Sequence, residues 1–412
     1  MKSALSPFSS LKITHFRNYL FGAFISEIGN QMQVVAVAWQ LYEITRNPAS
    51  LGLIGVANFI PILLFSLIGG LTVDKLDRRK LLIASLTTQA GIALILFVLS
   101  YFQVINPNLI YLCLILIATA QSFSIPARQA VIPHLVPRNN FMNAVSLGSL
   151  QFQAAIMIGP AIAGFLIGAA GVPPVYLFNA FSFLFFIVAI FALKIPLHQH
   201  NREKVKFSLS AVSEGIKFVI STPILYSTMI LDFLASFFGT ANILMPVFAK
   251  DVLHVGAQGL GFLYSAPAIG GVFAGVLIAA LHHKIKYQGK MIIVAVILYG
   301  AATIAFGLSK SFTLSLLFLM LVGFGDMVSS IIRNTIRQIV TPDHLRGRMA
   351  SITRIFFQGG PQLGEIEAGF LAKAIGGPAS VVIGGAGVIL ITSLVALKSK
   401  ALRNYQGKEL VV

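Results

Sequence analysis

Twelve long apolar stretches restrict this sequence to a narrow set of folds. A helix needs about 20 mostly apolar residues to cross the hydrocarbon core of a bilayer. Runs such as 110–120 show no alternation of period two, which argues against the strands of a membrane β-barrel. We therefore predict an all-α polytopic membrane protein with twelve spanning helices. The stretches are 16–42, 48–73, 81–103, 109–129, 141–169, 175–195, 223–249, 259–281, 291–309, 312–332, 349–372 and 379–397.

The distribution of positive charge predicts how the chain is oriented. Only 10% of its residues are charged, whereas soluble proteins contain about 25%. If Met1 lies in the cytoplasm, all but four of the 30 Lys and Arg residues fall on that side; the exceptions are Arg46, Lys250, Lys310 and Lys373. Lys and Arg in short loops resist translocation, so both termini are expected in the cytoplasm. A nucleic-acid-binding protein would gather its basic residues on one polar face, so no nucleic acid partner is expected.

The longest polar interruption divides the chain into two halves. It covers residues 196–222 and leaves six apolar stretches on each side. We therefore predict an N-terminal six-helix bundle at 1–195, a cytoplasmic linker at 196–222, and a C-terminal six-helix bundle with a basic tail at 223–412. Within the linker, Val212–Ile220 has helical apolar spacing and is expected to lie along the membrane surface.

Short matching segments indicate that the two halves are copies of one unit. Residues 128–133 (Arg-Gln-Ala-Val-Ile-Pro) and 337–342 (Arg-Gln-Ile-Val-Thr-Pro) agree at four of six positions. The pairs Gly159-Pro160 and Gly360-Pro361 then follow in the same order. Parallel six-helix repeats are the plan of the major facilitator transporters, which bind substrate at the repeat interface near mid-membrane.

The loop between the second and third stretches carries a specific motif. Residues 69–80 read Gly-Gly-Leu-Thr-Val-Asp-Lys-Leu-Asp-Arg-Arg-Lys. This resembles the signature Gly-x-x-x-Asp-Arg/Lys-x-Gly-Arg-Arg-Lys of the major facilitator superfamily, with Asp77 in place of the second glycine. The resemblance implies that Gly70 permits close helix approach. It also implies that Asp74 and Arg78 belong to a conformational latch, in which Asp74 pairs with basic groups or a helix N-terminus in the outward-facing state.

Nearly the whole chain is similar to the twelve-span drug–proton antiporter branch of that superfamily, which includes macrolide efflux and enterobactin export proteins. Gly159, Pro160 and Gly164 resemble the Gly-Pro motif of antiporters, and Arg128 is a candidate partner for Asp74. The resemblance implies a monomeric exporter of an amphiphilic drug or siderophore in the bacterial inner membrane, which works by alternating access and proton antiport. Lysophospholipid flippases share several of these segments and remain the alternative. The segments are 16–20, 124–128, 159–164 and 342–348.

Acidic residues inside the predicted spans are the candidate functional groups. An ionisable group at mid-bilayer costs about 2.5–3.5 kcal/mol on insertion scales, so it persists where it faces a water-filled cavity or a partner. Glu27 lies near the middle of the first stretch, with Asn30 and Gln31 one turn further on, and is the first candidate to carry a proton. The alternative is a carboxylate that only hydrogen-bonds to a neighbouring helix. Asp232 lies in the seventh stretch, which is equivalent to the first, and is expected to face the cavity.

Three further acids follow in the second half. Asp326 is two turns before Arg333 and is expected to form an interhelical ion pair. Glu365 and Glu367 are two residues apart, so only one of them points squarely at the cavity. Lys373 is expected to neutralise the other. The resemblance implies that the helices carrying these acids line the substrate cavity.

The sequence contains no pattern that indicates catalysis. It has no P-loop, no Ser/His/Asp spacing and no cluster of metal ligands, so we expect neither an enzyme nor a bound metal or cofactor. The energy source is then expected to be an ion gradient, with protons as the coupling ion and membrane lipid as the surroundings. His134 and His344 are expected in surface loops. The single cysteine, Cys113, is expected to be a small buried hydrophobe.

Overall fold

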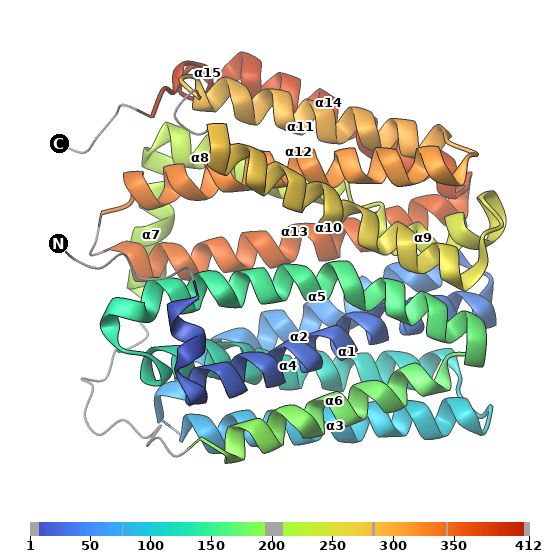
Figure 1. Ribbon diagram of the computed structural model, residues 1–412. Coiled ribbons are helices and arrows are strands. Elements are labelled where there is room, and N and C mark those ends of the chain that lie inside the picture. The colour runs from blue at the N-terminus through green and yellow to red at the C-terminus, as the bar shows by residue number, and fades with distance from the viewer. Residues whose placement is uncertain (1–7, 76, 194–208, 282–284, 343–344, 408–412) are drawn as a thin grey trace. The chain divides into compact units, whose positions relative to one another are not determined.

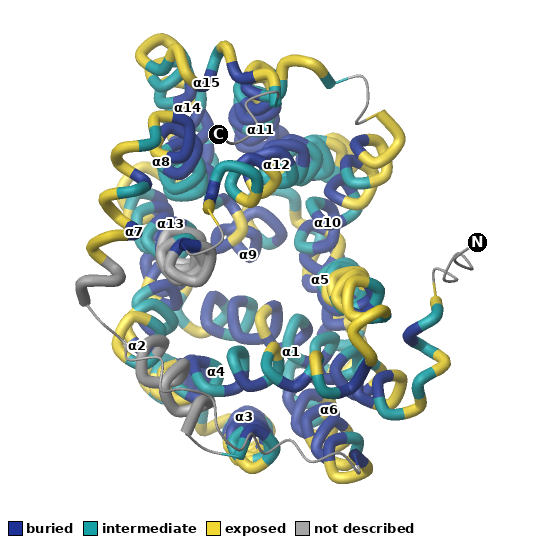
Figure 2. Tube along the Cα trace, turned by 90° about the vertical axis from the view of Figure 1, so that its left-hand side faces the viewer, coloured by how far each residue is buried: buried dark blue, intermediate teal, exposed yellow. Residues whose placement is uncertain are grey.

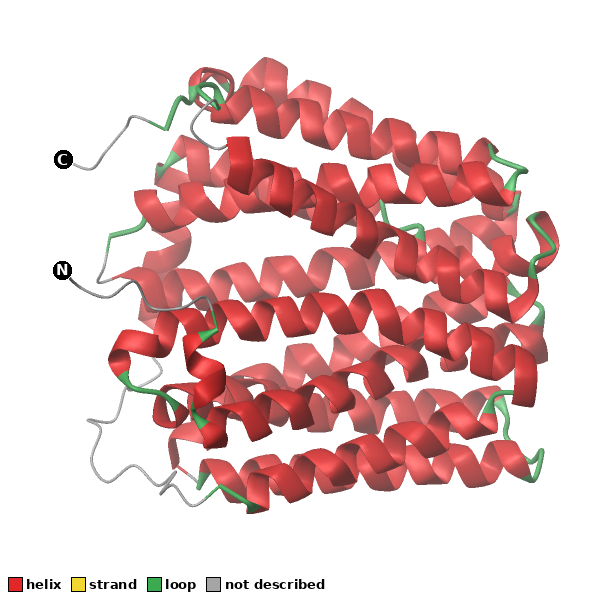
Figure 3. Cartoon of the chain, in the orientation of Figure 1, coloured by secondary structure: helices red, strands yellow, loops and turns green. Residues whose placement is uncertain are grey.

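The chain is built from helices joined by short loops. The computed structural model describes residues 8–75, 77–193, 209–281, 285–342 and 345–407. Within these ranges, the side chains of 66–75, 209–212, 346–348, 350–352 and 354–358 are not described. Figure 3 shows helix and loop but no strand among the described residues, which confirms the predicted all-α class.

The part of the chain described before residue 194 contains six long helices (Figure 1). Their positions agree with the predicted apolar stretches to within a few residues, except at the end of the fourth. There the sequence predicts an end at residue 129, but the helix continues to Leu135, because hydropathy marks the end of the apolar segment and not the end of the helix. The helices are α1 (Thr14–Thr45), α2 (Pro48–Lys75), α3 (Arg78–Tyr101), α4 (Pro107–Leu135), α5 (Phe141–Ala170) and α6 (Pro173–Phe191).

The later described ranges repeat this plan after a short additional helix. That helix, α7 (Leu209–Ser221), confirms the helix predicted from Val212–Ile220. In Figure 1, α11 and α14 lie side by side and pack against each other. The remaining elements are α8 (Pro223–Phe238), η3 (Asn242–Leu244), α9 (Met245–Val247), η4 (Phe248–Val252), α10 (Gly256–Leu281), α11 (Gln288–Leu308), α12 (Phe312–Val340), α13 (Arg346–Ile375), α14 (Gly377–Lys398) and α15 (Lys400–Asn404).

The seventh predicted stretch, 223–249, corresponds to a membrane-spanning segment, Pro223–Val252, that is not one continuous helix. Helix α8 ends at Phe238, and the chain then passes through a short 3₁₀ turn, one α turn and a π turn to Val252. Tyr299 of α11 contacts the chain at this break, where its hydroxyl donates a hydrogen bond of 2.8 Å to the carbonyl oxygen of Gly239. A Cβ at Gly239 would collide with the Tyr299 ring, so only glycine allows this contact.

Ten helical segments of the described chain are long and apolar enough to cross a membrane. Helices α1 and α13 are not among them, although they contain 32 and 30 residues and exceed the ~20 that a span requires. Both carry several charged side chains, among them Glu27 on α1 and Glu365 on α13. Charged side chains in spans face a partner or water and mark functional positions. These two helices are therefore the first places to look for a site.

The chain divides into two compact units. One contains Met1–Thr45 and Ile60–Val205, and the other contains Arg46–Phe59 and Lys206–Val412. The first half of α2 belongs to the second unit, which differs from the division at 1–195 and 223–412 expected from the sequence. The reason is a close approach of α2 to α13, where a Cβ at Gly52 would lie 3.1 Å from the Cα of Gly369.

Each unit has its own packed interior. Buried side chains of α1, α3, α4, α5 and α6 form one cluster in the first unit, and those of α8, α10, α11 and α12 contribute to one in the second. Figure 2 shows exposed residues along the same helices as buried ones. Many exposed residues are large and apolar, such as Val188 at 65% and Val276 at 66% exposure. A surface of this kind suits contact with lipid, where close packing and not the hydrophobic effect holds helices together.

Candidate functional site

The charged site of the first unit lies between α1 and α4. Gln31 Nε2 donates a hydrogen bond of 3.0 Å to Glu27 Oε1, and Arg128 Nη1 lies 3.7 Å from Glu27 Oε2. The side chains of Glu27 and Arg128 are only 12% and 22% exposed. Nearby, Gln121 Nε2 of α4 donates a 3.4 Å hydrogen bond to Asn30 Oδ1. The structure therefore brings the predicted Glu27, Asn30 and Gln31 together with α4.

Arg128 is fixed by more than its carboxylate partner. Its guanidinium lies over the ring of Phe186 on α6, with the carbon 4.9 Å from the ring centroid, and its carbonyl oxygen accepts a 3.2 Å hydrogen bond from the Tyr19 hydroxyl. Its Nε is buried and has no hydrogen-bond partner within the described chain. The sequence suggested Asp74 as the partner, but that side chain lies outside the described ones, and the ion pair that the structure contains joins Arg128 to Glu27.

Gly159 brings α5 into close contact with the acid-bearing turn of α1. A Cβ at Gly159 would lie 2.7 Å from Gln31 Cβ and 3.0 Å from the carbonyl oxygen of Ile28, so a larger residue would push the helices apart. Gly159, Pro160 and Gly164 are all buried, and α5 remains helical through Pro160. Small residues of this kind let membrane helices approach closely. The Gly-Pro motif thus helps to shape the surroundings of Glu27, while its antiport role stays a prediction.

The second unit contains a corresponding site between α8 and α12. Arg333 Nη2 lies 2.6 Å from Asp232 Oδ1 and 3.9 Å from Asp326 Oδ1, and Arg333 Nη1 donates a 2.7 Å hydrogen bond to Ser329 Oγ. Arg333 is 4% exposed and Asp232 is 13% exposed, whereas Asp326 is 61% exposed. Asp326 forms its ion pair with Arg333 of the same helix, α12. The prediction of an interhelical ion pair for Asp326 is therefore wrong. The interhelical partner of Arg333 is Asp232.

The two sites are related by the internal repeat. A Cβ at Gly360 of α13 would lie 3.1 Å from the carbonyl oxygen of Phe233, the residue that follows Asp232. In the first unit, the same relation joins Gly159 to Ile28, the residue that follows the acid of that unit. In both units an arginine on the fourth spanning helix, α4 or α12, then pairs with this acid. The repeat detected in the sequence thus extends to the position of each buried charge.

The remaining predicted acids are not part of these clusters. Glu365 and Glu367 lie on α13 and are partly buried, and neither forms an ion pair with a basic residue of the described chain. A Cβ at Gly55 would lie 3.1 Å from Glu365 Cβ, which places the stem of Glu365 against α2. Lys373 is exposed and does not pair with Glu367 within the described ranges, so the expected neutralisation is not seen.

The loop motif is described in part. Asp77 caps α3, since its carboxylate accepts hydrogen bonds from the backbone N–H groups of Arg79 at 2.8 Å and Lys80 at 3.3 Å. Arg78 is 7% exposed, and its Nη1 lies 3.2 Å from the carbonyl oxygen of Ala130 and 2.7 Å from His134 Nε2, both on α4. The surroundings of Gly70 and the side chain of Asp74 are not described, so their role in a latch remains a prediction.

Sequence reasoning missed two participants. His134 is not a loop residue, because α4 extends to Leu135 and places it against Arg78. Its proximity to the loop motif could have been found only if the extra helical turns had been anticipated. Tyr299, which donates a hydrogen bond to Gly239 at the break in the seventh span, had no signal in the sequence. His344 lies outside the described residues.

These charges are suited to a conformational change linked to a proton. Protonation of a buried carboxylate removes its attraction for the neighbouring arginine, and an arginine that loses its partner favours a different arrangement. Ionisable side chains within the spans, at equivalent positions of two six-helix units, are typical of polytopic membrane transporters. The relatives of this chain belong to the same class of protein.

The chain belongs to the MFS_3 family, described as transmembrane secretion effectors, which it matches over residues 4–411. It is 28% identical over 370 residues to the multidrug efflux pump Tap of Mycolicibacterium fortuitum, which covers 87% of this chain and 89% of Tap. It is 26% identical over 405 residues to the enterobactin exporter EntS of Salmonella choleraesuis, which covers 96% of this chain and 95% of EntS.

Solved structures show the same fold. A bacterial homologue of the human lysosomal transporter Spinster, in an inward-facing and occupied conformation, matches with a TM-score of 0.75 and 13% identity over 98% of this chain and 99% of that one. The nucleoside transporter NupG matches with a TM-score of 0.72 and 15% identity over 95% and 99%. At these identities the likeness concerns the fold alone, and it confirms the predicted major facilitator fold.

Proposed function

We propose that the protein is a secondary active exporter, which moves an amphiphilic small molecule of the drug or siderophore type out of the cytoplasm in exchange for protons. Two full-length relatives support this cargo class, since one is named a multidrug efflux pump and the other an enterobactin exporter. The observation that supports proton coupling is the partly buried ion pair between Glu27 and Arg128.

In the first unit, Glu27 is the proton carrier of this proposal. While ionised, it accepts the hydrogen bond of Gln31 and attracts Arg128. A proton on Glu27 cancels the attraction and leaves Arg128 as an uncompensated charge beside Phe186. The arginine then favours a conformation that offers another anion or water. A proton moving down 100 mV supplies about 2.3 kcal/mol, enough to shift a two-state equilibrium roughly fiftyfold.

In the second unit, Asp326 is the more accessible acid. Arg333 faces two carboxylates, and it lies much closer to Asp232 than to Asp326. The charge of Asp326 is therefore the less well neutralised of the two, and its side chain is 61% exposed in the middle of a span. Water or a cationic group of the cargo could reach this carboxylate. We propose that Asp326 meets the cargo or a second proton, while Asp232 and Arg333 remain a structural pair.

The orientation is part of the proposal. The protein lies in the bacterial inner membrane with both termini in the cytoplasm, and export moves cargo toward the side of Arg46, Lys250, Lys310 and Lys373. The support is the concentration of basic residues on the opposite side, where 26 of the 30 would lie.

The test is transport in proteoliposomes with an imposed pH gradient. Ethidium and enterobactin serve as cargo probes, and a pH-sensitive dye inside the vesicles follows protons. Wild-type protein should move at least one probe together with protons. Glu27→Gln should abolish movement driven by the gradient while leaving exchange at equal pH, and Glu43→Gln on the same helix should preserve both.

Two results would contradict the proposal. If Glu27→Gln retains gradient-driven transport, the proton does not travel through Glu27. If neither probe moves but a fluorescent lysophosphatidylethanolamine crosses the bilayer, the protein is a lipid flippase and not an exporter.

A further inference from the structure

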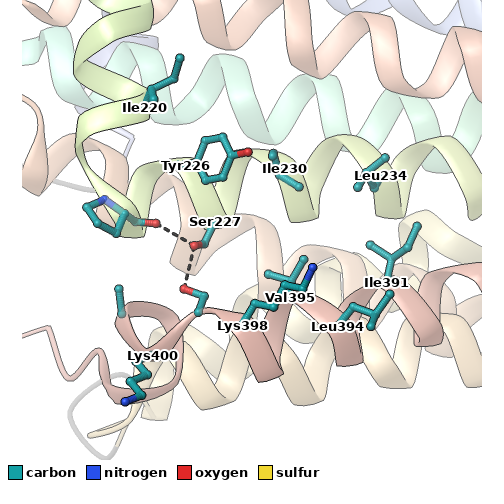
Figure 4. A pocket seen from close by; sticks show the side chains of 13 residues that line it. Ile220, Tyr226, Ser227, Ile230, Leu234, Ile391, Leu394, Val395, Lys398 and Lys400 are labelled. Carbon is teal, nitrogen blue, oxygen red and sulfur yellow. Dashed lines mark hydrogen bonds between the residues drawn. The ribbon is translucent and has the colours of Figure 1, made fainter.

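A groove opens on the second unit between α8 and α14. It encloses about 560 Å³ and is lined along α8 by Tyr226, Ile230 and Leu234, and along α14 by Ile391, Leu394 and Val395. Figure 4 shows the two rows of side chains facing each other across the groove. The volume is comparable to that of small-molecule sites, which range from about 300 to 1,000 Å³.

The apolar walls of the groove are oriented toward lipid. Tyr226 and Leu394 are each 46% exposed, and Ile220 at the end of α7 is 62% exposed. The neighbouring turns of α14 continue the same surface with Leu390 at 61% and Leu397 at 69% exposure. Exposed aliphatic side chains on a spanning helix favour contact with acyl chains over contact with water. The long axis of the groove therefore suits a hydrocarbon chain.

One end of the groove is positively charged. Lys398 and Lys400 line it there, both are exposed, and neither forms a hydrogen bond or ion pair with any residue of the described chain. In Figure 4 the Lys398 side chain extends between the two rows of apolar side chains, and Lys400 lies where α14 passes into α15. The charge asymmetry of the sequence places this end at the cytoplasmic surface, where anionic headgroups attract basic side chains.

Hydroxyl groups hold the two walls together beside these lysines. The Oγ atoms of Ser227 and Ser399 are 2.7 Å apart, and Ser227 Oγ donates a 2.7 Å hydrogen bond to the carbonyl oxygen of Pro223. Ser399 Oγ also accepts a 3.1 Å hydrogen bond from the backbone N–H of Leu402. These bonds join the start of α8 to the turn between α14 and α15. The backbone that carries the two lysines is thus fixed against the start of α8, so binding of a headgroup has to order only their side chains.

We propose that this groove binds one anionic phospholipid of the cytoplasmic leaflet. Its phosphate pairs with Lys398 and Lys400, and one acyl chain lies along Ile230, Leu234 and Leu394. The lysines provide the charge that a phosphodiester complements, and the aliphatic walls exclude a soluble anion as the preferred ligand. Phosphatidylglycerol fits this chemistry, because its headgroup carries a net negative charge that phosphatidylcholine lacks.

The proposal is tested by native mass spectrometry of the full-length protein in detergent. It is titrated with phosphatidylglycerol and with phosphatidylcholine of identical acyl chains. Wild-type protein should bind the former more tightly. Since a basic residue near an anionic lipid surface contributes roughly fivefold, Lys398→Gln/Lys400→Gln should weaken phosphatidylglycerol binding roughly 25-fold. Ile230→Trp, which fills the groove without altering charge, should weaken binding of both lipids.

The matched control is Lys286→Gln/Lys290→Gln, which removes two exposed lysines that do not line the groove. It should bind phosphatidylglycerol like the wild type. The proposal is overturned if the control loses as much affinity for phosphatidylglycerol as Lys398→Gln/Lys400→Gln does. It is equally overturned if Lys398→Gln/Lys400→Gln still binds phosphatidylglycerol more tightly than phosphatidylcholine. It is also overturned if glycerol 3-phosphate competes at the same concentration, because the ligand would then be a soluble phosphate. Thermal unfolding of each variant confirms that it is folded.

Discussion

A Cβ at Gly159 would lie 3.0 Å from the carbonyl oxygen of Ile28, so the backbone of α5 closely approaches the turn of α1 that carries Glu27. The fourth helix supplies the arginine to this turn, and the fifth supplies the glycine. The second unit repeats the arrangement with Gly360 and Phe233 at 3.1 Å. The glycine contact beside each acid therefore occurs at equivalent positions in both units, as the acids themselves do.

Gly159→Ala should destabilise the protein by about 1–3 kcal/mol, because the new methyl group would overlap Gln31 and separate α5 from α1. Gly148→Ala on the same helix is the control, since no atom lies within 4 Å of a Cβ there. It should be neutral or stabilising by up to ~1 kcal/mol, because Ala favours the helix more than Gly. The single cysteine, Cys113, is buried, so its reaction with a maleimide dye on heating reports unfolding. Equal melting temperatures for the two variants would contradict the packing argument.

Removal of Arg333 should be more harmful than removal of Asp232. Arg333→Gln removes the cation that forms ion pairs with both carboxylates and leaves Asp232 with only the more distant charge of Arg337. Breaking a buried pair by removal of one partner costs up to about 3–5 kcal/mol. Asp232→Asn leaves Arg333 with Asp326 and Ser329 as partners, so this variant should lose less stability than Arg333→Gln. The measurement is the fraction of monodisperse protein that survives a temperature ramp.

The double variant Asp232→Asn/Arg333→Gln completes a thermodynamic cycle. Since the two residues are in contact, their effects should not add, and the double variant should be more stable than Arg333→Gln alone. Additive losses would mean that the 2.6 Å pair contributes no coupling energy.

The helices and the repeat could be predicted from the sequence, because spans of about 20 apolar residues leave a strong signal and the Gly-Pro pairs mark equivalent positions. The pairing of charges could not. Glu27 and Arg128 lie on different helices, and one sequence contains no information on which turns of two helices face each other. The sequence suggested Asp74 as the partner of Arg128, and nothing in it pointed to Glu27.

The failures at helix ends have a common cause. Hydropathy detects where a segment leaves the hydrocarbon core, so it ended the fourth stretch at 129 although α4 continues to Leu135. It also read the seventh stretch as continuous, because residues 239–249 are as apolar as the helix before them. At the break, the chain is contacted by a tyrosine from another helix, and hydropathy carries no information on such a tertiary contact.

Tyr299→Phe should test that contact directly. It removes the hydroxyl that donates to the carbonyl oxygen of Gly239, which then keeps only the backbone N–H of Ala241 at 2.9 Å as a donor. Loss of one such hydrogen bond costs about 0.5–1.5 kcal/mol. Hydrogen exchange of residues 239–252 should become faster, while exchange in α14 stays unchanged. Tyr287→Phe is the control, since Tyr287 is 49% exposed. Unchanged exchange in Tyr299→Phe would show that the break does not depend on this bond.

Asp77 occupies a position where the family signature has glycine, and its role as the N-cap of α3 predicts an order of stability among variants. Asp77→Ala removes the acceptor for the N–H groups of Arg79 and Lys80 and should cost about 0.5–2 kcal/mol. Asp77→Gly should cost only a few tenths of a kcal/mol, because glycine is tolerated at this position and leaves the N–H groups open to water. The temperature at which Cys113 begins to react with the maleimide dye gives the melting temperature of each variant. A glycine variant that melts as early as the alanine variant would assign Asp77 a role other than capping, such as a charge that the loop requires.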